Sequence, residues 1–210
     1  MTRVLLVDDH AVVRQGLKQV LAESLPDATF GDASNADEAL RMVRTANWDI
    51  VVLDISLPGK SGIEALKELR AAHPRLPVLV LSMHPEEQFA VRALKAGAAG
   101  YVTKRTAARD VVAAVKKVLS GGRYVSPSLA ERLAAQTQAG SVDTPHETLS
   151  DREYQVFRLL AMGKTVKQIG KELDLSPQTV STHRTHILEK MGMQSNAELI
   201  QYAIQNQIRE

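Results

Sequence analysis

Polar side chains of three kinds follow short apolar runs in the first half of the sequence. They are three carboxylates, a hydroxyl and an amine, namely Asp8, Asp9, Asp54, Ser82 and Lys104. Clustered carboxylates repel one another unless they bind a proton or a cation, and an all-oxygen site suits Mg²⁺ or Mn²⁺. A divalent ion and a lysine can neutralise phosphate oxygens while one carboxylate attacks phosphorus. If the fold brings these side chains together, they form a site for phosphoryl transfer.

The apolar runs before these residues predict a parallel sheet. Each run is short, rich in β-branched residues and bounded by polar residues, Gly or Pro, as strands buried on both faces are. Helical periodicity fills the intervals between the runs. In an open α/β sheet, ligands bind at the carboxyl ends of the strands, which is where the polar residues stand. We expect an α/β fold with a five-stranded, doubly wound parallel sheet, whose strands lie within residues 4–7, 29–30, 50–53, 78–81 and 100–103.

The alternation of strands and helices ends at Gly121-Gly122, and helical periodicity alone follows. Residues 137–148 are poor in large apolar side chains, which is typical of a linker. We predict a first domain over residues 1–122, a linker over 123–147 with room for a short helix within 127–138, and an all-α domain of four helices over 148–210. Ser150 with Glu153 forms a capping-box pattern, and Ser176-Pro177 marks the start of the third helix.

The composition excludes several classes of protein. The 210 residues include no cysteine, which rules out disulfide scaffolds and thiolate chemistry. No apolar stretch approaches the roughly 18–20 residues of a membrane span, so we expect a cytoplasmic protein without a membrane partner. The net charge of +2 excludes a uniformly basic surface but not a local patch. Residues 164–190 hold five Lys or Arg against three Asp or Glu, so a basic surface there must be local.

The strand-end residues resemble a known family. The segments Val7–His10, Leu53–Gly59, Leu81–His84 and Tyr101–Lys104 resemble those of a bacterial response-regulator receiver domain. The resemblance implies a flavodoxin-like fold in which Asp54 is the phosphoacceptor. It also implies a bound Mg²⁺, whose ligands are Asp8, Asp9, Asp54 and the backbone carbonyl of Ser56.

Three further roles follow from the same resemblance. Lys104 contacts the phosphoryl group, Ser82 hydrogen-bonds one of its oxygens, and Tyr101 changes rotamer with it. The family frequently has proline after the lysine, whereas this chain has Arg105. The cis peptide bond that is common there is costly without proline.

The helical segment resembles a second family. Residues 167–192 are similar to a LuxR-type helix-turn-helix, and together with the receiver they resemble the NarL/FixJ subclass of response regulators. Gly170 stands where that family usually has Ala, and glycine costs a helix about 1 kcal/mol. A recognition helix enters the major groove, where polar side chains contact bases and cations contact phosphates. The candidate DNA contacts are Lys164, Lys167, Gln178, Thr179, Ser181, Thr182, Arg184, Thr185 and Lys190.

Together the resemblances imply a phosphorylation-dependent transcription regulator and not an enzyme. A sensor histidine kinase would phosphorylate Asp54, and the C-terminal helices would bind double-stranded operator DNA as a homodimer. Two alternatives stay open. One is a Mg²⁺-dependent phosphatase with an aspartate nucleophile, although such enzymes often have a second Asp where this chain has Ser56. The other is a regulator that binds DNA without phosphate, and the helices alone also fit a simple interaction module.

Overall fold

The computed structural model describes residues 1–57, 60–83, 86–105, 108–131, 134, 144–206 and 208. The chain forms two compact units, residues 1–135 and residues 136–210. The sequence predicts a linker over residues 137–148, and most of that segment lies outside the described residues. Within the described part of the chain, no helix combines the length and the apolar character needed to cross a membrane.

The first unit contains a five-stranded parallel sheet with the order β2-β1-β3-β4-β5. This order and the helices between the strands confirm the predicted doubly wound fold. The predicted runs all form strands, and β1, β3, β4 and β5 are buried on both faces along most of their length, whereas β2 is only partly buried. The strands are β1 (Arg3–Val7), β2 (Thr29–Ala33), β3 (Ile50–Leu53), β4 (Val78–Ser82) and β5 (Gly100–Thr103).

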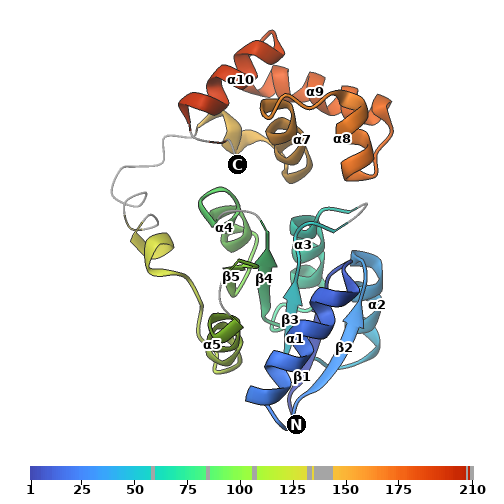
Figure 1. The fold of residues 1–210 in the computed structure, drawn as a ribbon, viewed down its shortest axis with the longest axis vertical. Helices are drawn as coiled ribbons and strands as arrows, with labels where there is room; N and C mark the ends of the chain where they lie inside the picture. Colours follow the sequence, from blue (N-terminus) through green and yellow to red (C-terminus); the bar gives the residue numbers. More distant parts are fainter. Residues whose placement is uncertain are drawn as a thin grey trace. The chain divides into compact units, whose positions relative to one another are not determined.

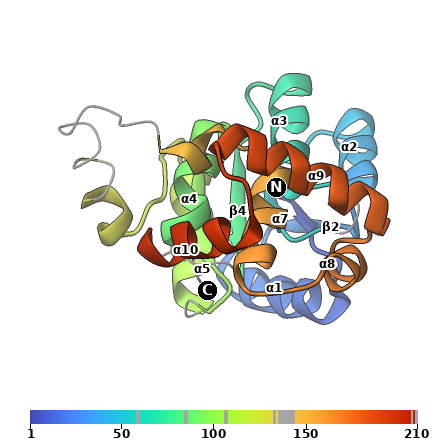
Figure 2. The same ribbon diagram turned by 90° about the horizontal axis from the view of Figure 1, so that it is seen from above.

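Helices cover both faces of this sheet (Figure 1). Seen along the other axis, α1 and α5 lie on one face, while α2 and α3 lie on the other, where α3 also packs against α4 (Figure 2). Apolar side chains of the strands and helices are completely buried between these layers, as Leu6, Leu21 and Val115 illustrate. The helices of this unit are α1 (Ala11–Ser24), α2 (Ala36–Thr45), α3 (Gly62–Ala72), α4 (Glu86–Lys95) and α5 (Ala108–Leu119).

The segment after α5 returns to the edge of the sheet. Tyr124 forms a parallel β-bridge with Gly100. The Tyr124 N–H donates to Ala99 O at 3.0 Å, and the Tyr101 N–H donates to Tyr124 O at 3.3 Å. Residues 127–131 are helical, and Leu129 within them is buried. The segment after α5 is therefore hydrogen-bonded to β5 before the chain leaves the first unit.

The described residues of the second unit form helices and the short connections between them. Ser150 and Glu153 form the expected capping box, and the Ser176 side chain caps the third helix. The turn between the second and third helices is tight, because Asp174 adopts a left-handed conformation with φ 54° and Leu175 N donates to Gly170 O at 2.8 Å. The elements are η1 (Pro145–Thr148), α7 (Asp151–Ala161), α8 (Val166–Leu173), α9 (Pro177–Met191) and α10 (Asn196–Gln205).

Candidate functional site

The strand ends of the first unit bring together the side chains expected to carry chemistry. Backbone hydrogen bonds continue just past the strands: Asp54 N donates to Val7 O at 2.8 Å, and Lys104 N donates to Ser82 O at 2.7 Å. These bonds align the carboxyl ends of β1, β3, β4 and β5 at one edge. The side chains of Asp8 and Asp54 are buried there despite their charge.

Lys104 joins the two buried carboxylates. Its Nζ lies 2.6 Å from Asp54 Oδ2 and 2.5 Å from Asp8 Oδ2, and its own side chain is 9% exposed. Buried charges are tolerated when they are paired, and Lys104 provides this pairing for both acids. One ammonium group therefore holds two carboxylates from different strands in one pocket.

Burial and this ion pair act in opposite directions on both partners. Burial raises the pKa of Asp54 above its usual value, although the charge and hydrogen bond of Lys104 lower it. Burial by itself lowers the pKa of Lys104, but the contacts with Asp54 and Asp8 outweigh this effect and the pKa is raised. Lys104 therefore stays protonated at neutral pH and can attract an anionic group to this pocket.

The loop after β3 orients Asp54. Ser56 N donates to Asp54 Oδ1 at 2.9 Å, which leaves Oδ2 to face Lys104. At the start of α3, a Cβ atom on Gly62 would lie 2.6 Å from the backbone oxygen of Asp54. Only glycine allows α3 to approach Asp54, the phosphoacceptor candidate, this closely. The role of Gly62 was not evident from the sequence.

Asp8, Asp9 and His10 form a compact group of possible metal ligands, whose donor atoms all lie within 4.8 Å of one another. Asp8 is buried, and its Oδ2 atom forms an ion pair with the Lys104 ammonium at 2.5 Å. Carboxylate oxygens are the ligands that a divalent cation such as Mg²⁺ prefers. The residues present therefore fit the expected metal, with His10 as a neighbour that the predicted ligand set did not include.

The other two residues expected to respond to phosphate are buried beside this pocket. Ser82 ends β4 and is completely buried, and Tyr101 in β5 is among the largest fully buried side chains. The Lys104–Arg105 peptide bond is trans, as expected for a bond that does not precede proline.

The exposed face of α9 carries most of the polar residues predicted to contact DNA. Val180, Ile187 and Met191 form its buried side. Two hydroxyls on the exposed face bond to the helix backbone: Thr182 to Gln178 O at 3.1 Å and Thr185 to Ser181 O at 3.2 Å. The exposed predicted contacts of α9 are Gln178, Thr179, Ser181, Thr182 and Thr185.

The predicted phosphate-binding cations divide into two groups. Lys167 is exposed on α8. In contrast, Lys190 Nζ lies 2.7 Å from Glu153 Oε2, Arg184 Nε donates to Asn196 Oδ1 at 2.6 Å, and Lys164 pairs with Glu172. Lys190 links α9 to α7 and Arg184 links α9 to α10, whereas Lys164 pairs at the surface from the loop before α8.

Comparison with known families decides the class of the protein. The model of the family described as response regulator receiver domain matches residues 4–116, and that of bacterial regulatory proteins, luxR family, matches residues 147–203. The chain belongs to the response regulators. By its family this regulator is a phosphoacceptor transcription factor and not an enzyme, which argues against the phosphatase alternative.

Two relatives and one solved structure match this regulator over nearly their whole length. The response regulator GacA of Pseudomonas aeruginosa is 37% identical over 207 residues, which cover 98% of this regulator and 97% of GacA. The response regulator UvrY of Escherichia coli K12 is 34% identical over 207 residues, with coverage of 98% and 95%. The structure of RcsB from Salmonella enterica serovar Typhimurium, bound to promoter rprA in the presence of the phosphomimetic BeF₃⁻, is similar with a TM-score of 0.64 and 25% identity, covering 96% of this regulator and 97% of RcsB.

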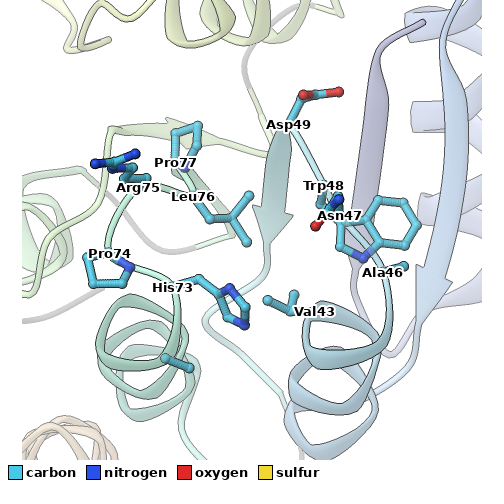
Figure 3. Close-up of a pocket in the computed structure, with 11 residues that line it drawn as sticks. Val43, Ala46, Asn47, Trp48, Asp49, His73, Pro74, Arg75, Leu76 and Pro77 are labelled. Carbon is cyan, nitrogen blue, oxygen red and sulfur yellow. The ribbon is translucent and has the colours of Figure 1, made fainter.

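The regulator also has a pocket of about 530 Å³ at the opposite edge of the sheet. It lies where β3 and β4 begin and where α2 and α3 end, between Val43, His73 and Leu76 (Figure 3). Asp49 precedes β3 on this side, whereas Asp54 follows β3 on the other. This pocket is therefore separate from the acidic site of the regulator.

Basic residues on α1 form a part of the acidic site that the sequence analysis missed. Arg14 donates to the backbone oxygen of Asp8, and Lys18 pairs with Asp32 in β2. The spacing of four residues places Arg14 and Lys18 on one side of α1. The spacing of Arg14 and Lys18 was visible in the sequence of the regulator, but the spacing alone did not show which strands these two side chains contact.

Proposed function

We propose that Asp54 accepts a phosphoryl group from a sensor histidine kinase. The observation that carries this proposal is the contact of Asp54 Oδ2 with the Lys104 ammonium at 2.6 Å, in a pocket closed by Asp8. The carboxylate attacks phosphorus, the bond from phosphorus to the donor nitrogen breaks, and an acyl phosphate forms. Lys104 neutralises the oxygens of the arriving phosphoryl group, because its ammonium already faces the attacking oxygen.

The same pocket would hold Mg²⁺ through Asp8, Asp9, Asp54 and the backbone carbonyl of Ser56. Its support is the set of carboxylates at this edge of the sheet: Asp8 and Asp9 belong to a compact group of possible ligands, and Asp54 shares the Lys104 ammonium with Asp8. When bound, the ion neutralises charge on the phosphate oxygens. Asp8 and Asp9 would hold the ion, while the Ser56 N–H and Lys104 hold the two oxygens of Asp54 in fixed directions.

We assign the response to phosphate to Ser82 and Tyr101. A phosphoryl group on Asp54 adds anionic oxygens beside the end of β4, where the Ser82 hydroxyl can donate to one of them. Tyr101 lies in the neighbouring strand β5, opposite Val80, and its backbone N–H donates to the Tyr124 carbonyl. A movement of β5 would therefore be transmitted to Tyr124, which lies in the segment that leaves the receiver. We place the receiver at residues 1–122, the linker at 123–147 and the DNA-binding domain at 148–210.

The second domain would bind double-stranded operator DNA through α9, as a homodimer formed on phosphorylation. RcsB, which is similar over nearly its whole length, has been solved bound to promoter DNA with a phosphomimetic. In this chain the exposed polar face of α9 and the exposed Lys167 suit the major groove and its phosphates. Because Lys164, Arg184 and Lys190 have protein partners, we expect weak binding by one copy and strong dependence on dimerisation.

Phosphorylation is tested with acetyl phosphate and Mg²⁺ on the full chain. Intact-mass spectrometry should show one added phosphoryl group on the wild type and none on Asp54→Asn. Asp37→Asn, which removes an exposed carboxylate from α2, is the matched control and should be modified like the wild type. Modification of Asp54→Asn to the wild-type extent would overturn the assignment, and rapid multiple turnover would favour a phosphatase instead.

DNA binding is tested by capture of genomic DNA fragments with and without the phosphodonor. The phosphorylated wild type should retain fragments with two half-sites roughly one helical turn apart. Asp54→Asn should retain far fewer of them under the same conditions. Equal retention by both proteins would contradict phosphate dependence and would identify a constitutive DNA-binding regulator.

A further inference from the structure

We infer that Arg14 is a positioning residue of the acidic site, whose guanidinium fixes the backbone of Asp8 and thereby sets the affinity of the site for Mg²⁺. This role rests on the proposed function, because it presupposes the magnesium site described there. It adds a residue of α1 that touches neither the metal nor the phosphoryl group. The contact that suggests it joins α1 to the end of β1, where Arg14 Nη1 donates to the backbone oxygen of Asp8.

The oxygen that Arg14 binds belongs to the peptide unit between Asp8 and Asp9. A peptide unit is planar, so a bond to its oxygen restricts the direction in which the chain continues to Asp9. The Asp8 side chain is held separately, because Oδ1 accepts the His10 N–H at 2.9 Å and Oδ2 pairs with the Lys104 ammonium at 2.5 Å. The Asp9 side chain is 32% exposed and lies beside the His10 ring. The position of its carboxylate therefore depends on the backbone that Arg14 holds.

Arg14 is itself held by a carboxylate of the neighbouring strand. Its Nε lies 3.9 Å from Asp32 Oδ1 in β2, and its side chain is 16% exposed. Lys18, one turn further along α1, pairs with Asp32 Oδ2, so both oxygens of Asp32 face cations of the same helix. Asp32 lies opposite Leu6 in the sheet, two residues before Asp8. Arg14 therefore bridges the ends of β1 and β2.

This bridge explains why the residue is an arginine. A guanidinium is planar and presents its N–H groups in a fixed fork, whereas an ammonium is a point charge without a preferred plane. Arg14 directs one edge of the fork to the Asp8 carbonyl and its Nε to Asp32. A lysine at this position would keep the charge but could not hold both partners in the same directions.

Position and charge make opposite predictions for the removal of Arg14. A cation near a metal site repels a divalent ion, so loss of its charge alone would strengthen Mg²⁺ binding. Loss of a residue that orients the ligands has the reverse effect, since part of the binding free energy must then order Asp8 and Asp9. The direction of the change in Mg²⁺ affinity therefore separates the two effects.

The test measures Mg²⁺ binding to the full-length wild type and to Arg14→Met by calorimetry. Methionine is a good helix former, so α1 is retained in this variant. We expect the Mg²⁺ affinity to fall about tenfold. With acetyl phosphate as donor, the Mg²⁺ concentration for half-maximal modification should rise by the same factor. The rate at saturating Mg²⁺ should change by less than about twofold, because Asp54 and Lys104 are untouched.

Arg41→Met is the matched control for charge. Hydrogen bonds from Ser34 lower the pKa of Glu38 at the start of α2, and the charges of Arg41 and Arg14 lower it further. Arg41 is thus a cation in the same part of the unit, but it is exposed on α2. Its removal should leave the Mg²⁺ affinity unchanged or slightly raised. Arg14→Lys tests the fork, and it should bind Mg²⁺ more weakly than the wild type although the charge is kept.

An Mg²⁺ affinity that is unchanged or raised in Arg14→Met would overturn the positioning role, and so would an equal loss in Arg41→Met. Urea unfolding of the metal-free proteins, followed by Trp48 fluorescence, checks that each variant is folded. If Arg14→Met does not fold, Arg14→Lys decides, and wild-type affinity in that variant would overturn the role. The proposed magnesium site fails separately, if the wild type binds no Mg²⁺ or if Asp9→Asn binds it as tightly as the wild type.

Discussion

The backbone oxygen of Tyr124 lies 2.5 Å from the point that a Cβ atom on Gly100 would occupy. Gly100 begins β5, and Tyr124 belongs to the segment that leaves the first unit. The two residues form a parallel bridge, and the neighbouring Tyr101 N–H binds the same Tyr124 oxygen. The absence of a side chain at residue 100 thus permits the exit segment to pair with the strand that carries Tyr101.

Gly100→Ala is expected to destabilise the first unit by about 1–3 kcal/mol, because the methyl group must displace backbone. Urea unfolding followed by the fluorescence of Trp48, the one tryptophan of the chain, measures this change. Gly16→Ala is the control, because a Cβ on this exposed residue of α1 meets nothing within 4 Å. That variant should gain about 0.5–1 kcal/mol. Equal stability changes in the two variants would show that the bridge at Tyr124 does not constrain residue 100.

The sequence was sufficient to predict the sheet but not this bridge. Strands buried on both faces leave a continuous apolar run, so Ile50–Leu53 and Val78–Leu81 were recognisable by pattern alone. A single bridged residue such as Tyr124 has no periodicity. It follows Gly121-Gly122, where the predicted alternation ends, and its partner is more than twenty residues earlier, so only the folded chain reveals the pairing.

The acidic site was predictable for a related reason. Strand ends share one edge of a parallel sheet, so Asp54 and Lys104 could be placed together before their 2.6 Å contact was known. The partners of long side chains could not be placed in this way. Periodicity shows which side of a helix is buried, but Lys190 reaches from an exposed position of α9 to Glu153 of α7, a contact that depends on how the two helices cross.

Mg²⁺ is expected to raise the stability of the first unit. A ligand that binds the folded state alone stabilises it by about 2.7 kcal/mol at 100 times its dissociation constant. Thermal unfolding in Mg²⁺ and after addition of a chelator should therefore differ for the wild type, and much less for Asp9→Asn. Asp37→Asn should retain the wild-type difference, since its carboxylate lies on the exposed side of α2. A full Mg²⁺ effect in Asp9→Asn would exclude Asp9 as a ligand.

The second unit is expected to lose stability in acid through Glu153. Burial raises the pKa of Glu153, but hydrogen bonds from Lys190 and Ser150 outweigh it, and the pKa is lowered from 4.5. An acid with a lowered pKa stabilises the fold above its unfolded pKa, and this contribution is lost as the pH falls through the folded pKa. Amide hydrogen exchange in α7 and α9 should therefore show falling protection below pH 4.5.

Lys190→Met tests the origin of that pH dependence. The Glu153 side chain is 5% exposed, so removal of its ammonium partner should cost about 1–3 kcal/mol at neutral pH. The acid-induced loss of protection should become smaller, because the pKa of Glu153 moves back towards its usual value. Lys171→Met, at an exposed position of α8, is the control. A similar acid profile in Lys190→Met and the wild type would assign the pH dependence to other groups.

Lys167 and Lys190 are expected to affect DNA binding differently. Lys167 is exposed at the start of α8, so Lys167→Met should weaken binding and reduce the slope of log affinity against log salt by about one, without a change in stability. Lys190→Met should lower the stability of the second unit as well, because Lys190 pairs with Glu153. The measurements are fluorescence anisotropy with a captured operator at several salt concentrations and hydrogen exchange on the free proteins. An unchanged salt slope for Lys167→Met would remove Lys167 from the interface.

Gly170→Ala tests the tight turn between α8 and α9. Helix propensity alone predicts a gain of about 1 kcal/mol, since glycine is a poor helix former. A Cβ on Gly170, however, would lie 2.6 Å from the backbone oxygen of Leu175, whose N–H already donates to Gly170 O. Because displaced backbone costs about 1–3 kcal/mol, we expect a net loss of stability. Hydrogen exchange in α8 and α9 measures it, and a gain like that expected for Gly16→Ala would mean that the turn shifts to accept the methyl group.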